Sequence, residues 1–241
     1  MFTTLSFGQD SLGLERYYPK PKITSIEFLF GPSQVGIIGN EKPPTRFGQS
    51  IYINSLENRL GYSFGIGVSH KLTKRFEIFA RLFYEQKGFV RTLDTLSFDN
   101  NFALISASRV WSENISNNYF TLTILPQLIL GSKAHFNIGA GGYVGSLISS
   151  RTEYKGQTSF TYVSDPGFNK YDFGLSFNAG ISYPIKTNLE LTFQLTANFG
   201  LHHISDQFTS FNYPKWYNSS YSVLMGIRFF NKENRYRNRL K

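Results

Sequence analysis

The sequence contains no cysteine. This absence excludes disulfides, thiolate metal sites, thiol nucleophiles and a lipidated cysteine at a mature N-terminus. Charged residues are also scarce, because they make up 17% of the chain, whereas soluble domains contain about 25%. No stretch approaches the roughly 20 consecutive apolar residues that a membrane-spanning helix requires. If the chain enters a membrane, it must therefore cross as β-strands.

Aromatic and basic residues, in contrast, are abundant. Aromatics make up 17% of the residues, with 24 Phe and 15 Tyr, and the net charge is +9. Such a charge favours anionic surfaces, and both lipopolysaccharide and nucleic acid qualify. The basic residues are scattered and form no stripe with interleaved aromatics, which argues against nucleic acid. We therefore expect outer-membrane lipid and lipopolysaccharide as partners, and no nucleic acid.

Residues 1–8 resemble the end of a secretory signal peptide. Ser6 and Gly8 would be the small residues before the cleavage site, and Gln9 would be the first mature residue. We interpret residues 1–8 as the remnant of a signal whose true start lies upstream of Met1, and residues 9–21 as an N-terminal periplasmic segment. An ordinary N-terminal tail is the alternative.

Alternation of apolar and polar residues with a period of two is the dominant pattern, and it predicts β-strands. Between residues 189 and 201 every odd position is apolar and every even position is polar or glycine, and residues 171–183 repeat this alternation. Six further segments follow it less strictly: 22–31, 58–70, 74–90, 116–131, 134–150 and 219–230. In the fourth segment Pro126 cannot donate to a ladder, so we expect a β-bulge there.

The eight expected strands are joined by connections of alternating length. Short turns are expected near 70–74, 131–133 and 184–188, and long loops near 32–57, 91–115, 151–169 and 204–218. An even strand count with this alternation is typical of bacterial outer-membrane barrels, whose short turns are periplasmic. Both termini, including the basic tail 232–241, would then lie in the periplasm.

The composition of the two strand faces indicates which face meets lipid. The non-apolar face consists mostly of Gly, Ser, Asn and Thr, which suit the crowded lumen of a narrow barrel. Strands of about 13 residues are longer than is usual in soluble proteins and cover the 9–11 residues needed to cross a bilayer. The sequence therefore predicts an all-β fold, an eight-stranded antiparallel up-and-down transmembrane β-barrel over residues 22–231, integral to the cell outer membrane.

Aromatic residues near the strand ends are expected to form two girdles, since rings with a polar tip favour the headgroup level. The expected outer girdle contains Tyr62, Tyr84, Tyr171 and Tyr221, and the inner one Phe76, Phe136, Tyr183 and Phe229.

Several strand motifs resemble a known family. They are Tyr84-Glu85-Gln86-Lys87-Gly88, Leu125-Pro126, Gly139 to Gly145, and Gly200-Leu201 followed by Ile204. Over residues 22–231 the chain is similar to the PorT-like outer-membrane β-barrel proteins of Bacteroidota. The resemblance implies a β-barrel fold and a location in the outer membrane. Some relatives serve the type IX secretion system or sit beside larger outer-membrane assemblies, and no catalytic residue comes with the family.

Seven charged residues share the inward parity of the strands. They are Glu27, Glu77, Arg81, Glu85, Asp172, Glu190 and Arg228. They could line an ion path or act as a proton relay, or they could form a salt-bridge network that plugs the lumen. Buried charges must be paired, and side chains can nearly fill an eight-stranded barrel, so we expect the plug.

A His-x-Ser pair lies late in the seventh strand. His203 and Ser205 resemble the catalytic element of the PagL-type lipid A deacylases, in which a His base activates a Ser nucleophile. The sequence places no supporting acid, and a rim histidine at a polar–apolar boundary explains the pair more simply. Adjacent strand residues point to opposite faces, so His202 and His203 should not share a metal ion. We expect no enzymatic activity, cofactor or metal.

The expected loop 91–115 is rather apolar for a free extracellular segment. Its apolar residues are Phe98, Phe102, Leu104, Ile105, Val110 and Trp111. Such a loop should cover the barrel mouth or contact another outer-membrane or periplasmic protein. The leading hypothesis is a non-enzymatic structural or accessory subunit of a larger outer-membrane assembly, with type IX protein secretion as one candidate process. A narrow pore for ions or small solutes and a lipid A-modifying rim hydrolase are the alternatives.

Overall fold

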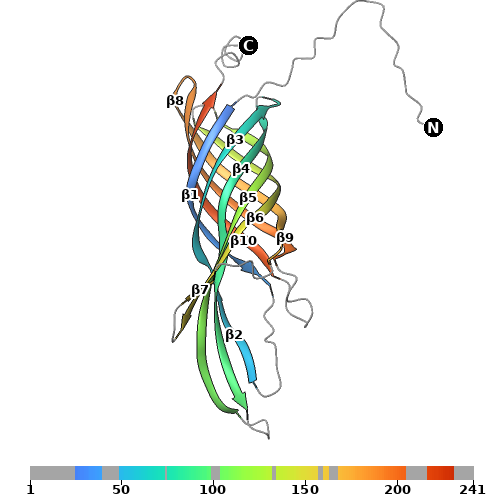
Figure 1. The fold of residues 1–241 in the computed structure, drawn as a ribbon. Coiled ribbons are helices and arrows are strands. Elements are labelled where there is room, and N and C mark those ends of the chain that lie inside the picture. The colour runs from blue at the N-terminus through green and yellow to red at the C-terminus, as the bar shows by residue number, and fades with distance from the viewer. Residues whose placement is uncertain are drawn as a thin grey trace, which may run out of the picture.

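The computed structural model describes residues 25–39, 49–73, 75–98, 104–131, 134–156, 160–162, 168–204 and 216–230. Eight of its ten strands close into an antiparallel barrel, as predicted (Figure 1). The barrel strands are β1 (Ser25–Ile38), β3 (Arg59–Lys71), β4 (Phe76–Phe98), β5 (Leu104–Leu130), β6 (His135–Gly156), β8 (Tyr171–Lys186), β9 (Leu189–His203) and β10 (Tyr217–Phe230). The ring closes because β1 pairs with both β3 and β10. No helix in the described residues is long and apolar enough to cross a membrane.

Side-chain burial follows the predicted alternation and gives an apolar exterior around a polar interior. In β8 the odd residues Phe173 and Leu175 are exposed, while the even residues Asp172 and Ser176 are buried. A soluble barrel would bury its apolar face, so this inverted arrangement fits a wall surrounded by lipid. Six of the eight predicted girdle residues are exposed on the wall, namely Tyr62, Tyr171, Tyr221, Phe136, Tyr183 and Phe229. Tyr84 and Phe76 are half-buried.

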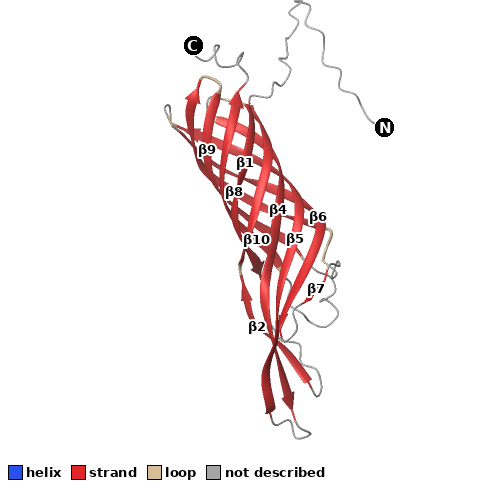
Figure 2. Cartoon of the chain, turned by 60° about the vertical axis from the view of Figure 1, so that its left-hand side comes forward, coloured by secondary structure: helices blue, strands red, loops and turns tan. Residues whose placement is uncertain are grey.

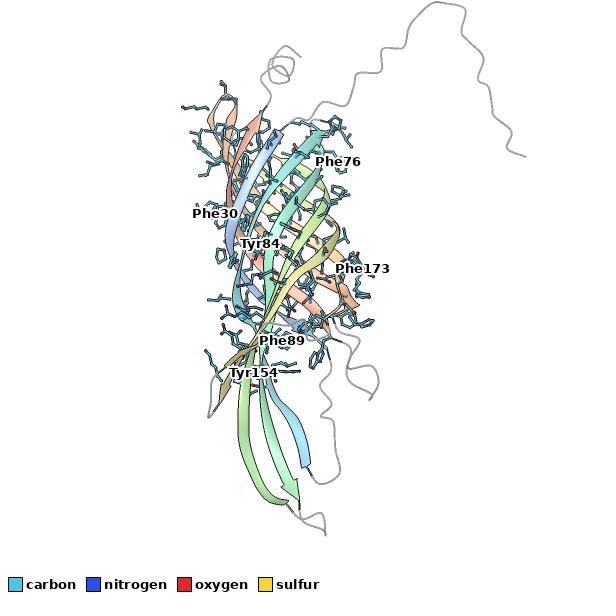
Figure 3. The ribbon with its side chains drawn as sticks, in the orientation of Figure 1. Phe30, Phe76, Tyr84, Phe89, Tyr154 and Phe173 are labelled. Atoms are coloured by element: carbon cyan, nitrogen blue, oxygen red, sulfur yellow. The ribbon has the colours of Figure 1, made fainter. Side chains whose placement is uncertain are left out.

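The two ends of the barrel differ. The connections from β3 to β4, β5 to β6 and β8 to β9 are short, and they lie at the same end as Ser25 and Phe230 (Figure 1). We call this the short-turn end and the opposite one the long-connection end. Figure 3 shows Phe76 near the short-turn end, and Phe89 and Tyr154 toward the other. The predicted signal remnant 1–8, the segment 9–21 and the tail 232–241 lie outside the described residues.

Strands β4 and β5 continue well past the barrel, so the expectation of a loop over 91–115 is wrong for most of that segment. The two strands pair from Phe76↔Leu128 to Phe98↔Leu104. β2 (Gln49–Glu57) pairs with the far part of β4, and β7 (Phe160–Tyr162) pairs with β6. We call residues 49–57, 90–98, 104–114, 152–156 and 160–162 the protruding sheet (Figure 2). Outside the membrane neither sheet face must be apolar, so the strands there lack a period-two signal.

Pro126 interrupts the β5–β6 ladder without forming the bulge that we expected. The bridges Ile124↔Gly142 and Gln127↔Gly139 flank the gap, and both strands have two residues between them. No extra residue is therefore accommodated at Pro126. The register shift in this ladder occurs instead between Asn118 and Tyr119.

Candidate functional site

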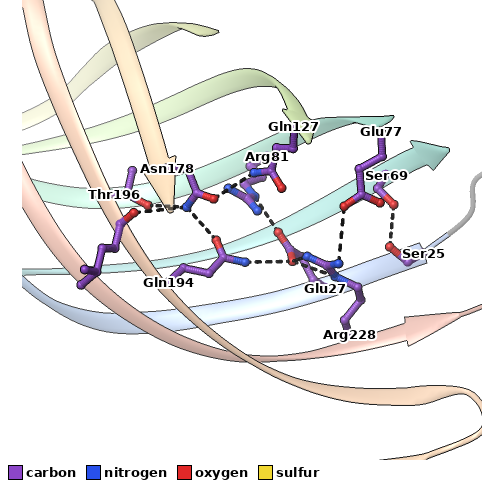
Figure 4. A network of polar contacts seen from close by, with 11 residues as sticks. Ser25, Glu27, Ser69, Glu77, Arg81, Gln127, Asn178, Gln194, Thr196 and Arg228 are labelled. Carbon is purple, nitrogen blue, oxygen red and sulfur yellow. Dashed lines mark hydrogen bonds and ion pairs between the residues drawn. The ribbon is translucent and has the colours of Figure 1, made fainter. Parts of the chain in front are cut away.

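The predicted interior charges lie inside the barrel, and Glu27 is the centre of the first cluster. Its carboxylate is fully buried and accepts hydrogen bonds from Arg81 Nε at 2.5 Å and Arg228 Nη2 at 3.0 Å. Glu77 Oε1 lies 3.5 Å from Arg228 Nη1. The guanidinium carbons of Arg81 and Arg228 each lie 4.6 Å from the centroid of the Phe79 ring. Two arginines and two glutamates from β1, β4 and β10 thus neutralise one another at the short-turn half of the lumen (Figure 4).

A chain of amides extends this cluster across the lumen. Gln194 Nε2 donates to Glu27 at 3.4 Å, and Asn178 Nδ2 donates to Gln194 Oε1 at 3.0 Å. Gln127 Nε2 in turn donates to Asn178 Oδ1 at 3.0 Å. The chain joins β5, β8 and β9 to β1 through side chains alone (Figure 4). Polar side chains therefore meet in the interior and do not merely line its wall.

A second charged cluster has the buried Lys87 at its centre. Lys87 Nζ lies 2.9 Å from Asp172 Oδ2 and 3.4 Å from Glu85 Oε2. The Tyr143 hydroxyl donates to Asp172 at 3.2 Å, and Asn198 Nδ2 donates to Glu85 at 3.3 Å. In ring order β4 and β9 are diametrically opposite, so the contact between Asn198 and Glu85 spans the barrel.

Lys87 is absent from the seven interior charges predicted from the sequence. Its odd number matches the inward parity of Glu77, Arg81 and Glu85 on the same strand, so the alternation itself could have identified it. The structure also separates the roles within Tyr84 to Gly88. Tyr84 stacks on Phe64 at the exterior, Lys87 points inward, and Gly88 has a φ of 138°. A Cβ at Gly88 would collide with the carbonyl of Ile115, so this position requires glycine.

A buried apolar cluster, which we call the apolar cap, lies beyond Lys87 at the long-connection end. It consists of the buried residues Phe89, Ile115, Phe168, Ile204 and Trp216. Phe89 and Trp216 contact edge to face, with ring centroids 5.7 Å apart. Beside this cap Arg91 pairs with Glu113 and lies 5.9 Å from the Trp216 ring. The sequence analysis missed this cluster, because four of its five members lie in expected loops.

The structure describes the predicted lumen charges in full and the predicted partner-loop residues only in part. All seven lumen charges are buried, and Glu190 Oε1 also lies 3.5 Å from His135 Nδ1. The backbones of Phe98, Leu104, Ile105, Val110 and Trp111 lie in β4 and β5. The side chains of these partner-loop residues, and Phe102 altogether, lie outside the described part of the structure, so their role in partner contact stays a prediction.

His203 ends strand β9, and its proposed partner Ser205 lies outside the described residues. The His202 and His203 rings stack with centroids 4.7 Å apart. The expectation that these rings point to opposite faces is therefore wrong, because the regular alternation does not hold where the strand ends. Among the described residues no group of three or more His, Cys, Asp or Glu could hold a metal ion. The catalytic pair of His203 and Ser205 stays a prediction.

A wall of outward apolar residues around a charged interior defines an integral membrane barrel. A protein-family model described as "Outer membrane protein beta-barrel domain" matches residues 21–206. The chain therefore belongs to this family and is an integral protein of the outer membrane. Comparison with curated proteins gave no match.

Solved structures similar to the chain include outer-membrane proteins with different roles. The attachment invasion locus protein Ail of Yersinia pestis is 9% identical, with 86% of this chain and 100% of that chain covered and a TM-score of 0.40. Neisserial surface protein A is 11% identical, with 86% and 97% covered and a TM-score of 0.43. The Escherichia coli outer-membrane protease OmpT is 9% identical, with 88% and 98% covered and a TM-score of 0.37. Likeness at this level assigns no function to the chain.

Proposed function

We propose that the protein is a non-conducting, non-enzymatic barrel that acts as a structural or accessory subunit of a larger outer-membrane assembly. It anchors the protruding sheet at the membrane surface, where the sheet contacts a partner protein. One observation carries the proposal: the barrel interior is bridged and capped, while β4 and β5 extend beyond it as paired strands.

The side-chain bridges across the interior argue against the narrow pore. A continuous watery path would have to pass the cluster of Glu27, Arg81 and Arg228, then the contacts of Lys87, and finally the apolar cap. Moving any of these charges aside would leave its partner buried without a counter-charge, which costs several kcal/mol. The ion pairs therefore serve as a plug that holds opposite walls together.

Orientation follows from the two barrel ends. Short turns in this class of barrel face the periplasm, so we place Ser25 and Phe230 there and the protruding sheet outside the cell. The partner is then another outer-membrane or cell-surface protein. Type IX protein secretion is one candidate process, which rests on the resemblance to the PorT-like proteins.

The test combines conductance with partner capture. In planar bilayers the purified protein should give no stepwise current, and a reproducible ohmic conductance would overturn the non-conducting role. For capture, a variant would have residues 93–111 replaced by an Asn-Gly turn, because Thr92 and Ser112 face each other in the ladder. Its matched control would carry a lengthened turn at residues 187–188, at the opposite end.

Gentle detergent extraction and mass spectrometry of each tagged protein would then identify the co-purifying proteins. The truncated variant should lose a stoichiometric partner that the wild type and the control retain. If the truncated barrel folds and keeps every partner, the protruding sheet is not the interface.

A further inference from the structure

A row of contacting aromatic rings lies on one side of the barrel wall. Tyr62, Tyr84 and Phe120 come from the adjacent strands β3, β4 and β5. The centroids of Tyr62 and Tyr84 are 6.1 Å apart, and those of Tyr84 and Phe120 are 5.9 Å apart. Tyr62 and Phe120 are exposed on the wall. Because aromatic rings of barrels gather at the headgroup level, this row lies where the hydrocarbon ends.

Basic side chains lie directly beyond this row. The Arg59 guanidinium donates to the Ile115 carbonyl at 3.0 Å and also to the Ser116 hydroxyl. Ser116 faces Arg151 in the β5–β6 register, and paired residues of antiparallel strands are about 5 Å apart. The Arg151 side chain is 55% exposed and pairs with Glu153 at 3.1 Å. Arg59 therefore reaches the residue of β5 that faces Arg151 of β6.

The belt continues along β6 and onto β8. Lys155 is exposed two residues beyond Glu153, and Lys170 is exposed at the start of β8, next to the exposed Tyr171. The Lys170 carbonyl accepts a hydrogen bond from the Leu147 amide, which fixes its position beside β6. We call Arg59, Arg151, Lys155 and Lys170 the basic belt; Glu153 is the acid within it.

The other side of the barrel differs. At the same end, no arginine or lysine occurs in three segments: residues 34–39 at the end of β1, residues 198–203 of β9 and residues 217–222 of β10. The positive charge in the described part of this rim is therefore concentrated over β3 to β8. In the described part of the rim, this concentration of basic side chains beside an aromatic row fits an oriented anionic ligand.

We propose that this side of the barrel binds a phosphorylated glycolipid of the lipid A type. Its acyl chains would lie on the apolar wall below Tyr62 and Phe120, its sugars over the aromatic row, and its phosphates against Arg59, Arg151 and Lys155. Guanidinium groups suit phosphate because they donate two parallel hydrogen bonds to it. Identifying the ligand as an outer-leaflet lipid rests on the orientation given under the proposed function.

The test uses the full chain in phosphatidylcholine vesicles with and without lipid A. The variant R151Q/K155Q changes two exposed side chains and keeps Arg59, which supports the backbone of β5. The control R75Q/K186Q removes two exposed basic residues at the short-turn end. Lipid A should raise the unfolding temperature of the wild type and the control, and R151Q/K155Q should need about tenfold more lipid A for half of that shift, as the loss of a charge-assisted contact implies.

Two further measurements make the outcome specific. Lipid A stripped of its phosphates should give no shift with the wild type. E153Q removes the competing carboxylate, so it should reach half of the shift at a lower lipid A concentration. A variant R151Q/K155Q that responds like the wild type, or an equal response to dephosphorylated lipid A, would overturn the proposal. Lipid A occupies both leaflets of these vesicles, so a negative result concerns the belt and not the orientation or the partner contact of β4 and β5.

Discussion

Removal of the Glu27 carboxylate should be among the most damaging single changes in the barrel. In Glu27→Ala, the guanidinium groups of Arg81 and Arg228 lose the acceptor that lies 2.5 Å and 3.0 Å away. Both arginines are buried, so water cannot replace that acceptor without opening the lumen. Breaking a buried ion pair from one side typically costs about 3–5 kcal/mol. We expect a loss of this size in the free energy of unfolding.

The matched control is Glu153→Ala, since Glu153 pairs with an arginine on the outer surface. Exposed pairs of this kind contribute about 0–1 kcal/mol. Urea unfolding in lipid vesicles, followed by tryptophan fluorescence, measures both variants, because Trp216 is buried in the apolar cap and becomes exposed on unfolding.

The double variant with Arg81→Ala gives a second check. Because the two residues share one contact, their combined cost should be smaller than the sum of the single costs. Equal losses for Glu27→Ala and Glu153→Ala, together with strict additivity in the double variant, would show that the interior charges do not act as a paired network.

Two more predictions concern Lys87 and Gly88. Lys87→Met leaves the buried carboxylates of Glu85 and Asp172 without their cation, so the same unfolding assay should show a loss of about 3–5 kcal/mol; a loss under about 1 kcal/mol would contradict the pairing. Gly88→Ala should cost about 1–3 kcal/mol because φ is 138° and a Cβ there would meet the Ile115 carbonyl. Gly142→Ala is its control, since a Cβ there meets nothing nearer than 3.6 Å and should change stability by less than about 0.5 kcal/mol; equal effects would refute the conformational argument.

Strand parity placed Glu27, Arg81 and Arg228 inside the barrel, but it could not show which of them meet. Glu27 faces Arg228 across the pair of β1 and β10 that closes the ring, 201 residues apart in the chain. Which residues meet depends on the closure of the ring and on the register between its strands. Neither can be predicted from the alternation within one strand. The apolar cap is hidden for the same reason, because Phe89, Phe168 and Trp216 come together only when the ring is closed.

The protruding sheet shows that strands can form where the sequence has no alternation of apolar and polar residues. Where β4 and β5 cross the membrane, lipid on one side and the lumen on the other impose a period of two. Beyond Gly88 that contrast ends, so the sequence of this segment is typical of a loop, although β4 and β5 pair as far as Phe98↔Leu104. Backbone hydrogen bonds can continue a sheet without any alternation of side chains.

The sequence by itself determined the compartment, the number of barrel strands and the face that meets lipid, because a bilayer imposes its polarity on every residue of a spanning strand. Only the tertiary structure decided that ion pairs bridge the interior, that Lys87 is the centre of one charged cluster there, and that β4 and β5 extend beyond the barrel. These features depend on the register between strands that are far apart in the chain. The physical reason is that parity is a property of one strand, whereas pairing across a lumen is a property of the closed ring.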